Sequence, residues 1–140
     1  MHVIPEHPQS PLSAIIERTP GTFWEHLGCR AVAVESGRTV IALDVEPKHL
    51  NPMGIVHGGV LSSLLDSAMG VAVMHAHPNH HAVTTNLNLH FVASFQEGTL
   101  TATAHIMHAS RSTVTVEARV EDAQGKLGTT ATGSFRLLSK

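Results

Sequence analysis

The sequence predicts an α+β fold in which a curled antiparallel β-sheet wraps around one long central helix. The segment 58–75 is long, contains no proline and is apolar on nearly every side, so other structure needs to enclose it. The segments on either side of it are rich in β-branched residues or alternate between apolar and polar positions, as half-buried strands do. A sheet that curls around the helix buries both elements at once.

Length, charge and cysteine content narrow the class of protein. The 140 residues, 42% of them hydrophobic, suffice for one domain spanning 1–140 and leave no room for a second. A formal charge of −2 with scattered basic residues gives no footprint for a nucleic-acid partner. The single cysteine, Cys29, allows no intrachain disulfide. The N-terminus lacks the basic start and apolar run of a secretory signal, so we expect a cytoplasmic protein that does not enter a membrane.

The elements before the central helix are predicted from turn signals and from a change of period. Residues 1–27 are expected to be a lead-in with a short helix that packs against the body. The segments 31–34 and 39–45 are rich in β-branched residues and are separated by Ser36-Gly37. They therefore predict a hairpin.

Four further strands are expected after the helix. Alternation between apolar and polar residues predicts strands over 87–95, 100–106, 113–120 and 127–137. Turn signals lie between consecutive strands, and they predict that the four are successive antiparallel neighbours. The turns are Glu97-Gly98, Ser110–Ser112 and Gln124-Gly125.

Asp66 is the only Asp, Glu, Lys or Arg within residues 49–96, and it lies in the middle of the apolar helix. An unpaired buried carboxylate costs several kcal/mol, so its position needs an explanation. One explanation is that neighbouring hydroxyls of Ser62, Ser63 or Ser67 hold the carboxylate. The other is a general base or nucleophile whose reactivity the apolar setting tunes. Residue chemistry alone leaves both open.

A pair of glycines, Gly58 and Gly59, opens the helix directly after Asn51-Pro52-Met53-Gly54-Ile55-Val56-His57. The first amides of a helix lack partners within the helix, and a terminus without side chains can bind a developing oxyanion. The alternative is that the glycines only make a tight entry turn. The combination of His57, Gly58-Gly59 and Asp66 within one short block favours the functional interpretation.

Helix geometry separates the two candidate catalytic groups. Gly58 and Asp66 are eight residues apart, which places them about 12 Å apart along one helix axis. One carbonyl group cannot touch both in the same chain. We therefore expect a twofold homodimer in which each active site combines Gly58 of one subunit with Asp66 of the other.

The block NPMGIVHGGVLSSLLD, residues 51–66, resembles the signature of hotdog-fold thioesterases of the PaaI type, the acyl-CoA thioesterase 13-like group. The likeness extends from about Gly28 to the C-terminus. It implies the hotdog fold, a homodimer or homotetramer, and hydrolysis of an aromatic or fatty acyl-CoA substrate. It also implies that no metal and no organic cofactor take part.

The resemblance assigns catalytic roles by position. The backbone N–H of Gly58 binds the thioester oxygen, and His57 and Asn51 orient and polarise that end of the substrate. Asp66 from the opposite subunit activates water or attacks the carbonyl carbon itself. Thr84, early in the next strand, helps to position the water, although its neighbour Thr85 competes for this role because a shift of one residue reverses the face.

The resemblance also suggests substrate-binding residues. The turn Ser110-Arg111-Ser112 corresponds to a loop that contacts the nucleotide end of coenzyme A, and Arg111 suits a phosphate, with a solvated hairpin arginine as the alternative. Gly59 is placed with the substrate-binding residues. Phe91 corresponds to a position near the acyl or pantetheine channel, but it lies on the alternating apolar face, which favours core packing.

Other classes of function are weighed against the thioesterase. His75, His77, His80 and His81 have the short spacing of metal ligands, but no cysteine or carboxylate accompanies them, so we expect loop histidines and no metal. A hotdog module that binds acyl-CoA without hydrolysing it is the main alternative, and the intact Asp66 favours the enzyme. Hydratases of the same fold place an Asp and a His close together before the helix, a pattern that is absent here. The acyl group, the choice between coenzyme A and an acyl carrier protein, and the choice between base and nucleophile stay open.

Overall fold

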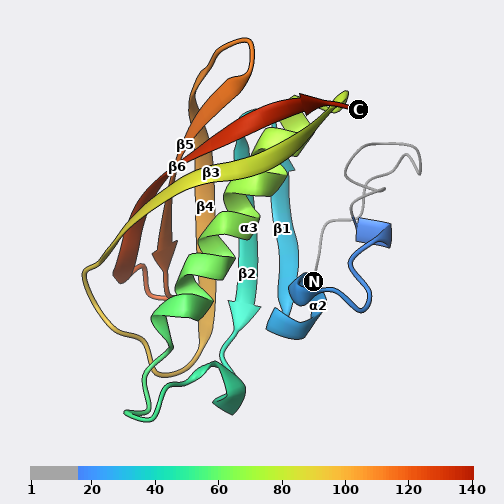
Figure 1. Cartoon of the computed structure of the whole chain (residues 1–140). Coiled ribbons are helices and arrows are strands. Elements are labelled where there is room, and N and C mark those ends of the chain that lie inside the picture. Colours follow the sequence, from blue (N-terminus) through green and yellow to red (C-terminus); the bar gives the residue numbers. More distant parts are fainter. Residues whose placement is uncertain (1–15) are drawn as a thin grey trace.

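The computed structural model describes residues 16–140, and Figure 1 shows their arrangement. The part of the predicted lead-in before residue 16 lies outside the described residues. The elements, in chain order, are α2 (Phe23–Leu27), β1 (Cys29–Glu35), β2 (Arg38–Asp44), the 3-10 helix η1 (Pro47–His49), α3 (Gly58–Ala76), β3 (His80–Phe91), β4 (Thr99–Ala109), β5 (Thr113–Glu121) and β6 (Leu127–Ser139).

The six strands form one antiparallel sheet in the order β1-β2-β4-β5-β6-β3. The sheet curls around α3, and α2 lies beside the start of β1 (Figure 1). This arrangement confirms the predicted α+β hotdog fold. Ser36 and Gly37 form the predicted hairpin turn between Glu35 and Arg38, and Gly37 adopts a φ of 74° that favours glycine.

Two predictions about the sheet are wrong. The strand predicted over 87–95 is β3, which begins at His80 and ends at Phe91. The Glu97-Gly98 turn does not make β3 and β4 neighbours, because β3 pairs with β6 and β4 pairs with β2 and β5. The chain leaves β3 at Phe91 and passes β6 and β5 before it enters β4, which lies between β5 and β2. Alternation predicts that a strand exists and which face it buries, but it carries no information about which strand lies beside it.

The strand β3 contains a bulge that changes its phase. Its register against β6 shifts between Thr84 and Asn86. Before the shift His80, Ala82 and Thr84 are the partly buried residues, and after it Leu87 and Leu89 are. A bulge of one residue therefore lets even-numbered and then odd-numbered side chains of the same strand face α3.

The helix α3 forms the centre of the core. By length and composition it could cross a membrane, but here it packs inside the curled sheet as the core helix. Leu64, Leu65, Ala68 and Met69 are fully buried. A side chain at Gly133 of β6 would lie 2.7 Å from the Met69 sulfur, so this glycine permits the close approach of sheet and helix.

Candidate active site

The two glycines at the start of α3 have different surroundings. The N–H of Gly59 donates to Nδ1 of His57 at 2.7 Å, which caps the helix. A side chain at Gly59 would lie 2.9 Å from that same nitrogen, so the cap requires glycine here. The N–H of Gly58 has no acceptor among residues 16–140. Gly58 is thus the helix amide that is left for a ligand.

The cap also determines the proton position on His57. Because Nδ1 accepts a hydrogen bond from Gly59, the neutral ring carries its proton on Nε2. The His57 residue is exposed, so this second nitrogen is available as a donor near the start of α3. Two donors of different kinds therefore lie at the same helix end.

Asn51 shapes the loop that leads into the helix. Its side-chain oxygen accepts from the N–H of Met53 at 2.9 Å and of Ile55 at 3.3 Å, and its backbone N–H donates to the Ile55 carbonyl. The amide nitrogen of its side chain has no acceptor within the described chain. Asn51 thus fixes the loop with one end of its side chain and leaves the other end free.

His49, which the sequence did not single out, is only 2% exposed. Its Nδ1 accepts from the N–H of Glu46 and its Nε2 donates to the Leu27 carbonyl, both at 2.8 Å, while its own carbonyl accepts from the N–H of His57. His49 therefore joins α2 and η1 through its ring and the entry to α3 through its backbone carbonyl. The spacing Glu46-Pro47-Lys48-His49, which forms a capping box, is the signal that could have revealed it.

Asp66 is half-buried, and Thr84 holds it. The Thr84 hydroxyl donates to Oδ1 of Asp66 at 2.7 Å. The hydroxyl of the neighbouring Thr85 instead donates to the Ser134 carbonyl at 3.1 Å. Among the two threonines, the structure thus brings Thr84 to the carboxylate, and the bulge in β3 is the reason.

The alternative explanation for Asp66, support by nearby serines, is wrong. Ser62 donates to the Gly58 carbonyl and Ser63 to the Gly59 carbonyl, each at 2.7 Å. Ser67 forms its hydrogen bond with Cys29. These hydroxyls satisfy the helix backbone and the thiol, so the carboxylate depends on a strand residue rather than on its own helix.

A hollow of about 310 Å³ lies beside the helix N-terminus, and we call it the Phe91 hollow. Its lining includes Asn51, Gly58, Phe91, Val92 and Ser94, but not Asp66. Gly58 and Asp66 both lie on α3, so the axial separation of about 12 Å holds within one chain. The structure brings Asn51, His57 and Gly58 together at one end of α3 and pairs Asp66 with Thr84 farther along.

The expectation that Phe91 packs in the core is wrong, since its side chain is 54% exposed. Its ring lies over Gly58, where a β-carbon would meet the ring at 3.4 Å. Phe91 does continue the inward face of Leu87 and Leu89, but α3 begins with glycine and offers no side chain to cover the ring. The exposed ring thereby becomes part of the lining of the Phe91 hollow.

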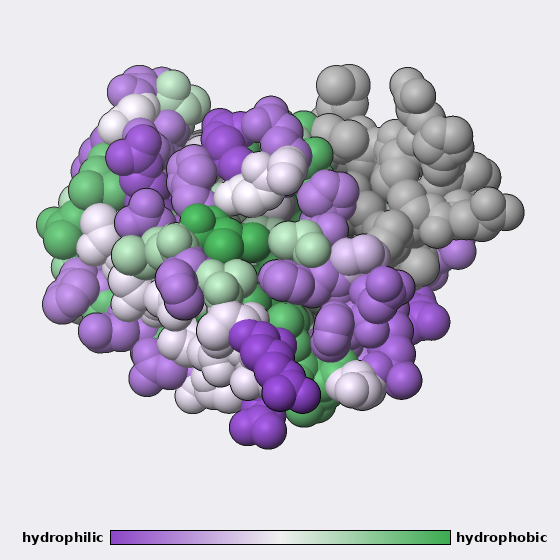
Figure 2. All heavy atoms as spheres, turned by 90° about the horizontal axis from the view of Figure 1, so that it is seen from above, coloured by the Kyte–Doolittle hydropathy of each residue, from purple (hydrophilic) through white to green (hydrophobic). Residues whose placement is uncertain are grey.

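The turn Ser110-Arg111-Ser112 lies between β4 and β5 and is exposed. It is found at the top of Figure 1, near the C-terminal end of α3, whereas Gly58 lies at the other end. The structure therefore does not bring this turn to Gly58 within one chain. Seen from above, this end of the molecule shows mainly hydrophilic and intermediate residues, with hydrophobic ones in narrow bands (Figure 2).

The remaining titratable candidates do not form a site within residues 16–140. In that range no three His, Cys, Asp or Glu side chains come together as metal ligands. The rings of His77 and His80 meet edge to face with centroids 6.3 Å apart. Burial raises the pKa of the Cys29 thiol to about 11, against the opposing hydrogen bond from Ser67. A thiol with this pKa is protonated at neutral pH and is a poor nucleophile.

Comparison with known proteins supplies the family. Residues 53–129 match the model of the family described as the thioesterase superfamily. The chain belongs to the thioesterase superfamily. The matched range contains Gly58, Asp66 and Thr84.

Named relatives agree over most of this thioesterase. The 1,4-dihydroxy-2-naphthoyl-CoA hydrolase of Listeria monocytogenes serotype 1/2a is 35% identical over 104 residues, which cover 74% of this chain and 85% of the relative. The PaaI protein of E. coli superimposes with a TM-score of 0.85 at 25% identity, over 92% of this chain and 91% of that chain. PaaI of Thermus thermophilus gives a TM-score of 0.77 at 31% identity, over 83% and 98%. The predicted resemblance to PaaI-type hotdog thioesterases is confirmed, and the chain is a thioester hydrolase.

Proposed function

We propose that this thioesterase hydrolyses acyl-CoA to a free acid and coenzyme A, at sites that two subunits share. The observation that carries the proposal is the free N–H of Gly58 at the start of the helix that also bears Asp66. The names of relatives support the substrate class, because they include a naphthoyl-CoA hydrolase and acyl-coenzyme A thioesterase 13.

In the proposed reaction the thioester oxygen accepts hydrogen bonds from the Gly58 N–H and from Nε2 of His57. Asp66 of the partner subunit takes a proton from water while the water oxygen attacks the carbonyl carbon. The negative charge that develops on the carbonyl oxygen is stabilised by the positive end of α3. Collapse of the intermediate breaks the carbon–sulfur bond and releases the thiolate, which takes up a proton. Direct attack by the Asp66 carboxylate, through an anhydride that water then hydrolyses, uses the same groups.

The open edge of β3 supports a twofold dimer. This 12-residue strand pairs with β6 along one edge, and its other edge has no strand beside it among the described residues. Val83 and Phe91 of this strand are 46% and 54% exposed. A long edge strand with apolar side chains is suited to pair with a second copy of itself. We propose a homodimer as the active unit in the cytoplasm, and a homotetramer would contain two of these units.

The remaining assigned residues have supporting roles in this proposal. Asn51 directs its free amide nitrogen to the substrate, and Thr84 orients the Asp66 carboxylate and the attacking water. Arg111, with Ser110 and Ser112, binds a phosphate of coenzyme A that belongs to a site in which the partner subunit takes part.

Thiol release from a panel of acyl-CoA esters tests the proposed function. We expect turnover of at least one ester of a short, a long or an aromatic acid, detected by a thiol reagent. The Asp66→Asn variant serves as the control for background hydrolysis. A dimeric wild-type protein that binds these esters but releases no thiol would contradict hydrolysis and would support an acyl-CoA-binding module.

A further inference from the structure

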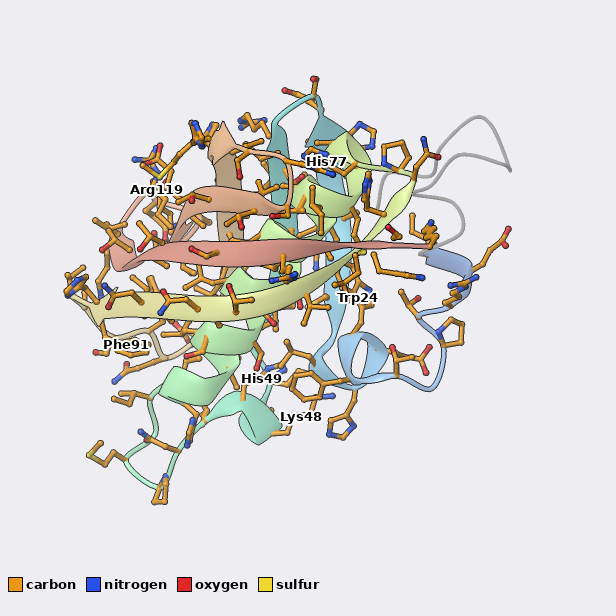
Figure 3. All side chains as sticks on the ribbon, turned by 45° about the horizontal axis from the view of Figure 1, so that its top comes forward. Trp24, Lys48, His49, His77, Phe91 and Arg119 are labelled. Atoms are coloured by element: carbon orange, nitrogen blue, oxygen red, sulfur yellow. The ribbon has the colours of Figure 1, made fainter. Side chains whose placement is uncertain are left out.

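Both halves of the proposed site are in contact with the strand β3. The Thr84 hydroxyl donates to Asp66 at 2.7 Å, and a β-carbon at Gly58 would lie 3.4 Å from the Phe91 ring. Figure 3 shows β3 at the front of the molecule beside β6, with Phe91 near its end. Asp66 of one subunit therefore comes close to Gly58 of the other when Thr84 of the first lies opposite Phe91 of the second.

The bulge in β3 is compatible with this pairing. Residues directly opposite each other in an antiparallel pair have their side chains on the same face of the sheet. In a regular strand that pairs with its own copy, opposite residues are therefore an even number of positions apart. Thr84 and Phe91 are seven positions apart, but the ladder skips Thr85, which leaves six. The two residues can thus be opposite each other only because one residue between them is bulged out.

This pairing fixes the position of the twofold axis. With Thr85 left out, the midpoint between Thr84 and Phe91 is Asn88. An axis moved by one position displaces one strand along the other by two residues, which is about 7 Å. Thr84 would then no longer lie opposite Phe91 of the other subunit. The shared site therefore selects one register among the possible ones.

The same register pairs side chains of matching character along β3. Leu87 lies opposite the partner's Leu89, and both are inward-facing, partly buried residues. Asn86 lies opposite the partner's His90, and both are exposed. The two copies of Asn88 meet on the axis, where each amide can donate to the other and accept from it. Each face of the strand thus continues into the same face of its copy.

Two exposed valines give independent support for this register. Val83 is 46% exposed and Val92 is 58% exposed. When the pairing is continued by one residue beyond Thr84 and Phe91, Val83 lies opposite the partner's Val92. An axis moved by one position in either direction would place each valine opposite a histidine, an asparagine or a serine instead. Only the axis at Asn88 lets the valines cover each other.

We propose that two copies of this chain pair through β3 with Asn88 on the twofold axis and Phe91 of one subunit opposite Thr84 of the other. The inference rests on the shared site of the proposed function, and it specifies how the second copy is placed. In this register each active site combines Asp66 and Thr84 of one subunit with Gly58 and Phe91 of its partner.

Introduced thiols test the position of the axis, in a Cys29→Ala background that contains no other cysteine. Asn88→Cys places two thiols opposite each other, with Cα atoms about 5 Å apart, and we expect at least about half of the chains to form a disulfide-linked dimer on mild oxidation. Asn86→Cys is the matched control, an exposed asparagine of the same strand whose two copies lie about 14 Å apart along it. We expect it to form less than about a tenth as much linked dimer on a non-reducing gel.

A double variant, Asn86→Cys with His90→Cys, tests the register away from the axis. It should form linked dimers although neither single substitution does. Native mass spectrometry of the wild type establishes the dimer. A dimer in which Asn86→Cys links as well as Asn88→Cys, or in which neither links, would overturn the register, and so would a monomeric wild type.

The exposed valines provide a test without cross-linking. Val83→Asp places a carboxylate against a valine twice in each dimer, and we expect the dimer dissociation constant to rise at least about tenfold. Val32→Asp is the control, because Val32 is a 41% exposed valine of β1 at the opposite edge of the sheet. It should change the constant less than about threefold in sedimentation equilibrium. Equal weakening by both substitutions would contradict the pairing of Val83.

Hydrolysis by the linked Asn88→Cys dimer connects the register to the active unit. We expect its rate, followed by the loss of thioester absorbance, to be within about threefold of the reduced protein, because the link holds the native register. A loss of activity that reduction restores would overturn the inference. If the wild type releases no thiol but the cross-links form as expected, hydrolysis fails and the register stands. If thiol is released and Asn88→Cys does not link, the register fails and hydrolysis stands.

Discussion

The two proposed catalytic groups, the Gly58 N–H and the Asp66 carboxylate, lie on one helix but are held in different ways. At the start of α3 the donor is a backbone N–H, and hydrogen bonds between backbone groups and the side chains of His49, Asn51 and His57 hold the surrounding segment in place. In the middle of α3 the acting group is the side chain of Asp66, which Thr84 holds through one hydrogen bond. The position of the Gly58 N–H therefore depends on how several segments fold together, whereas the position of the Asp66 carboxylate depends on its contact with Thr84. Single substitutions should affect them in different ways.

The largest loss of activity is expected from a substitution of the Asp66 side chain. Asp66→Asn keeps an oxygen that can accept from Thr84, so folding should be retained. The amide can neither take a proton from water nor attack the carbonyl carbon, and we expect kcat to fall at least about a hundredfold. Steady-state thiol release measures the loss, with a thermal melt to establish folding. Near-normal turnover in a folded variant would remove Asp66 from the mechanism.

At the start of α3 a change to the main chain tests the Gly58 donor directly. Gly58→Pro deletes the N–H, and we expect a loss of about a hundredfold in kcat. Proline is tolerated in the first helical turn, and His57 already has the extended conformation (φ −61°, ψ 137°) that precedes proline.

Gly58→Ala is the matched control, because it keeps the N–H and adds a β-carbon at 3.4 Å from the Phe91 ring. We expect it to retain kcat within about fivefold. Equal losses in the proline and alanine variants would assign the effect to crowding at Phe91 rather than to the amide.

Mixing the two inactive variants tests whether the halves combine between subunits. In a heterodimer of Asp66→Asn and Gly58→Pro chains, one shared site receives both defects and the other receives neither. Random exchange makes half of all dimers hetero, so about a quarter of wild-type activity should return. Activity is measured after exchange, and native mass spectrometry counts the heterodimers. Heterodimers as inactive as their parents would show that each site is built within one chain.

The contact of Asp66 with Thr84 predicts a smaller effect with its own internal control. Thr84→Val removes the hydroxyl that donates to the carboxylate, and we expect kcat to fall about tenfold while KM changes little. Thr85→Val removes a hydroxyl that bonds to the Ser134 carbonyl and should change kcat less than about twofold. A larger loss in Thr85→Val than in Thr84→Val would contradict the pairing.

Cys29, which bonds to Ser67 next to Asp66, should affect stability but not turnover. Burial raises the pKa of its thiol from 9.0 to about 11, so the folded chain keeps the proton to higher pH than the unfolded chain. The resulting stability is fully present below about pH 9 and is lost as the pH rises towards 11, by about 1–2 kcal/mol for a partly buried group.

Denaturant melts at pH 8 and pH 11 should therefore show a fall in wild type that Cys29→Ala lacks. The chain has no tyrosine, so thiolate absorbance can be followed directly. A wild-type thiolate that forms near pH 9 in the folded state would contradict the raised pKa. A large loss of kcat in Cys29→Ala would mean that the thiol contributes to catalysis together with Asp66.

The sequence predicts the elements of this fold well because hydrophobic period is a local property. The enclosed helix 58–76 and the hairpin at Ser36-Gly37 follow from patterns within short windows. The neighbour of β3 does not, since pairing with β6 depends on the path of the chain after Phe91. The order of the strands is set by packing of the whole sheet on α3. A short stretch of sequence contains no information about that packing.

The candidate site was partly visible for similar reasons. The single carboxylate of Asp66 within an apolar helix can be recognised in the sequence, and so can the glycine pair. The separate surroundings of Gly58 and Gly59 cannot, because they depend on the rotamer of His57.

The prediction of exposed loop histidines is wrong for His75, which lies in α3, and for His80 and His81, which lie in β3, and only His81 of the four is exposed. Like these positions, His49 is not predictable, because a buried histidine with both nitrogens bonded has the same letter in the sequence as an exposed one. Phe91 is exposed because of where α3 begins. The alternation of residues along β3 gives no information about the position of the helix start.

The bulge in β3 has a consequence for how this enzyme can be altered. Thr84 and Leu87 are an odd number of residues apart, and both face α3 because the bulge accommodates the extra residue between Thr84 and Asn86. Deleting residue 85 would remove the bulge and restore regular alternation, in which Thr84 and Leu87 still share one face. A one-residue deletion between Leu87 and Leu89, where the strand is regular, would instead turn one of these two side chains outward. In an alignment of relatives, a gap at residue 85 should therefore be compatible with a hydroxyl beside the helix carboxylate.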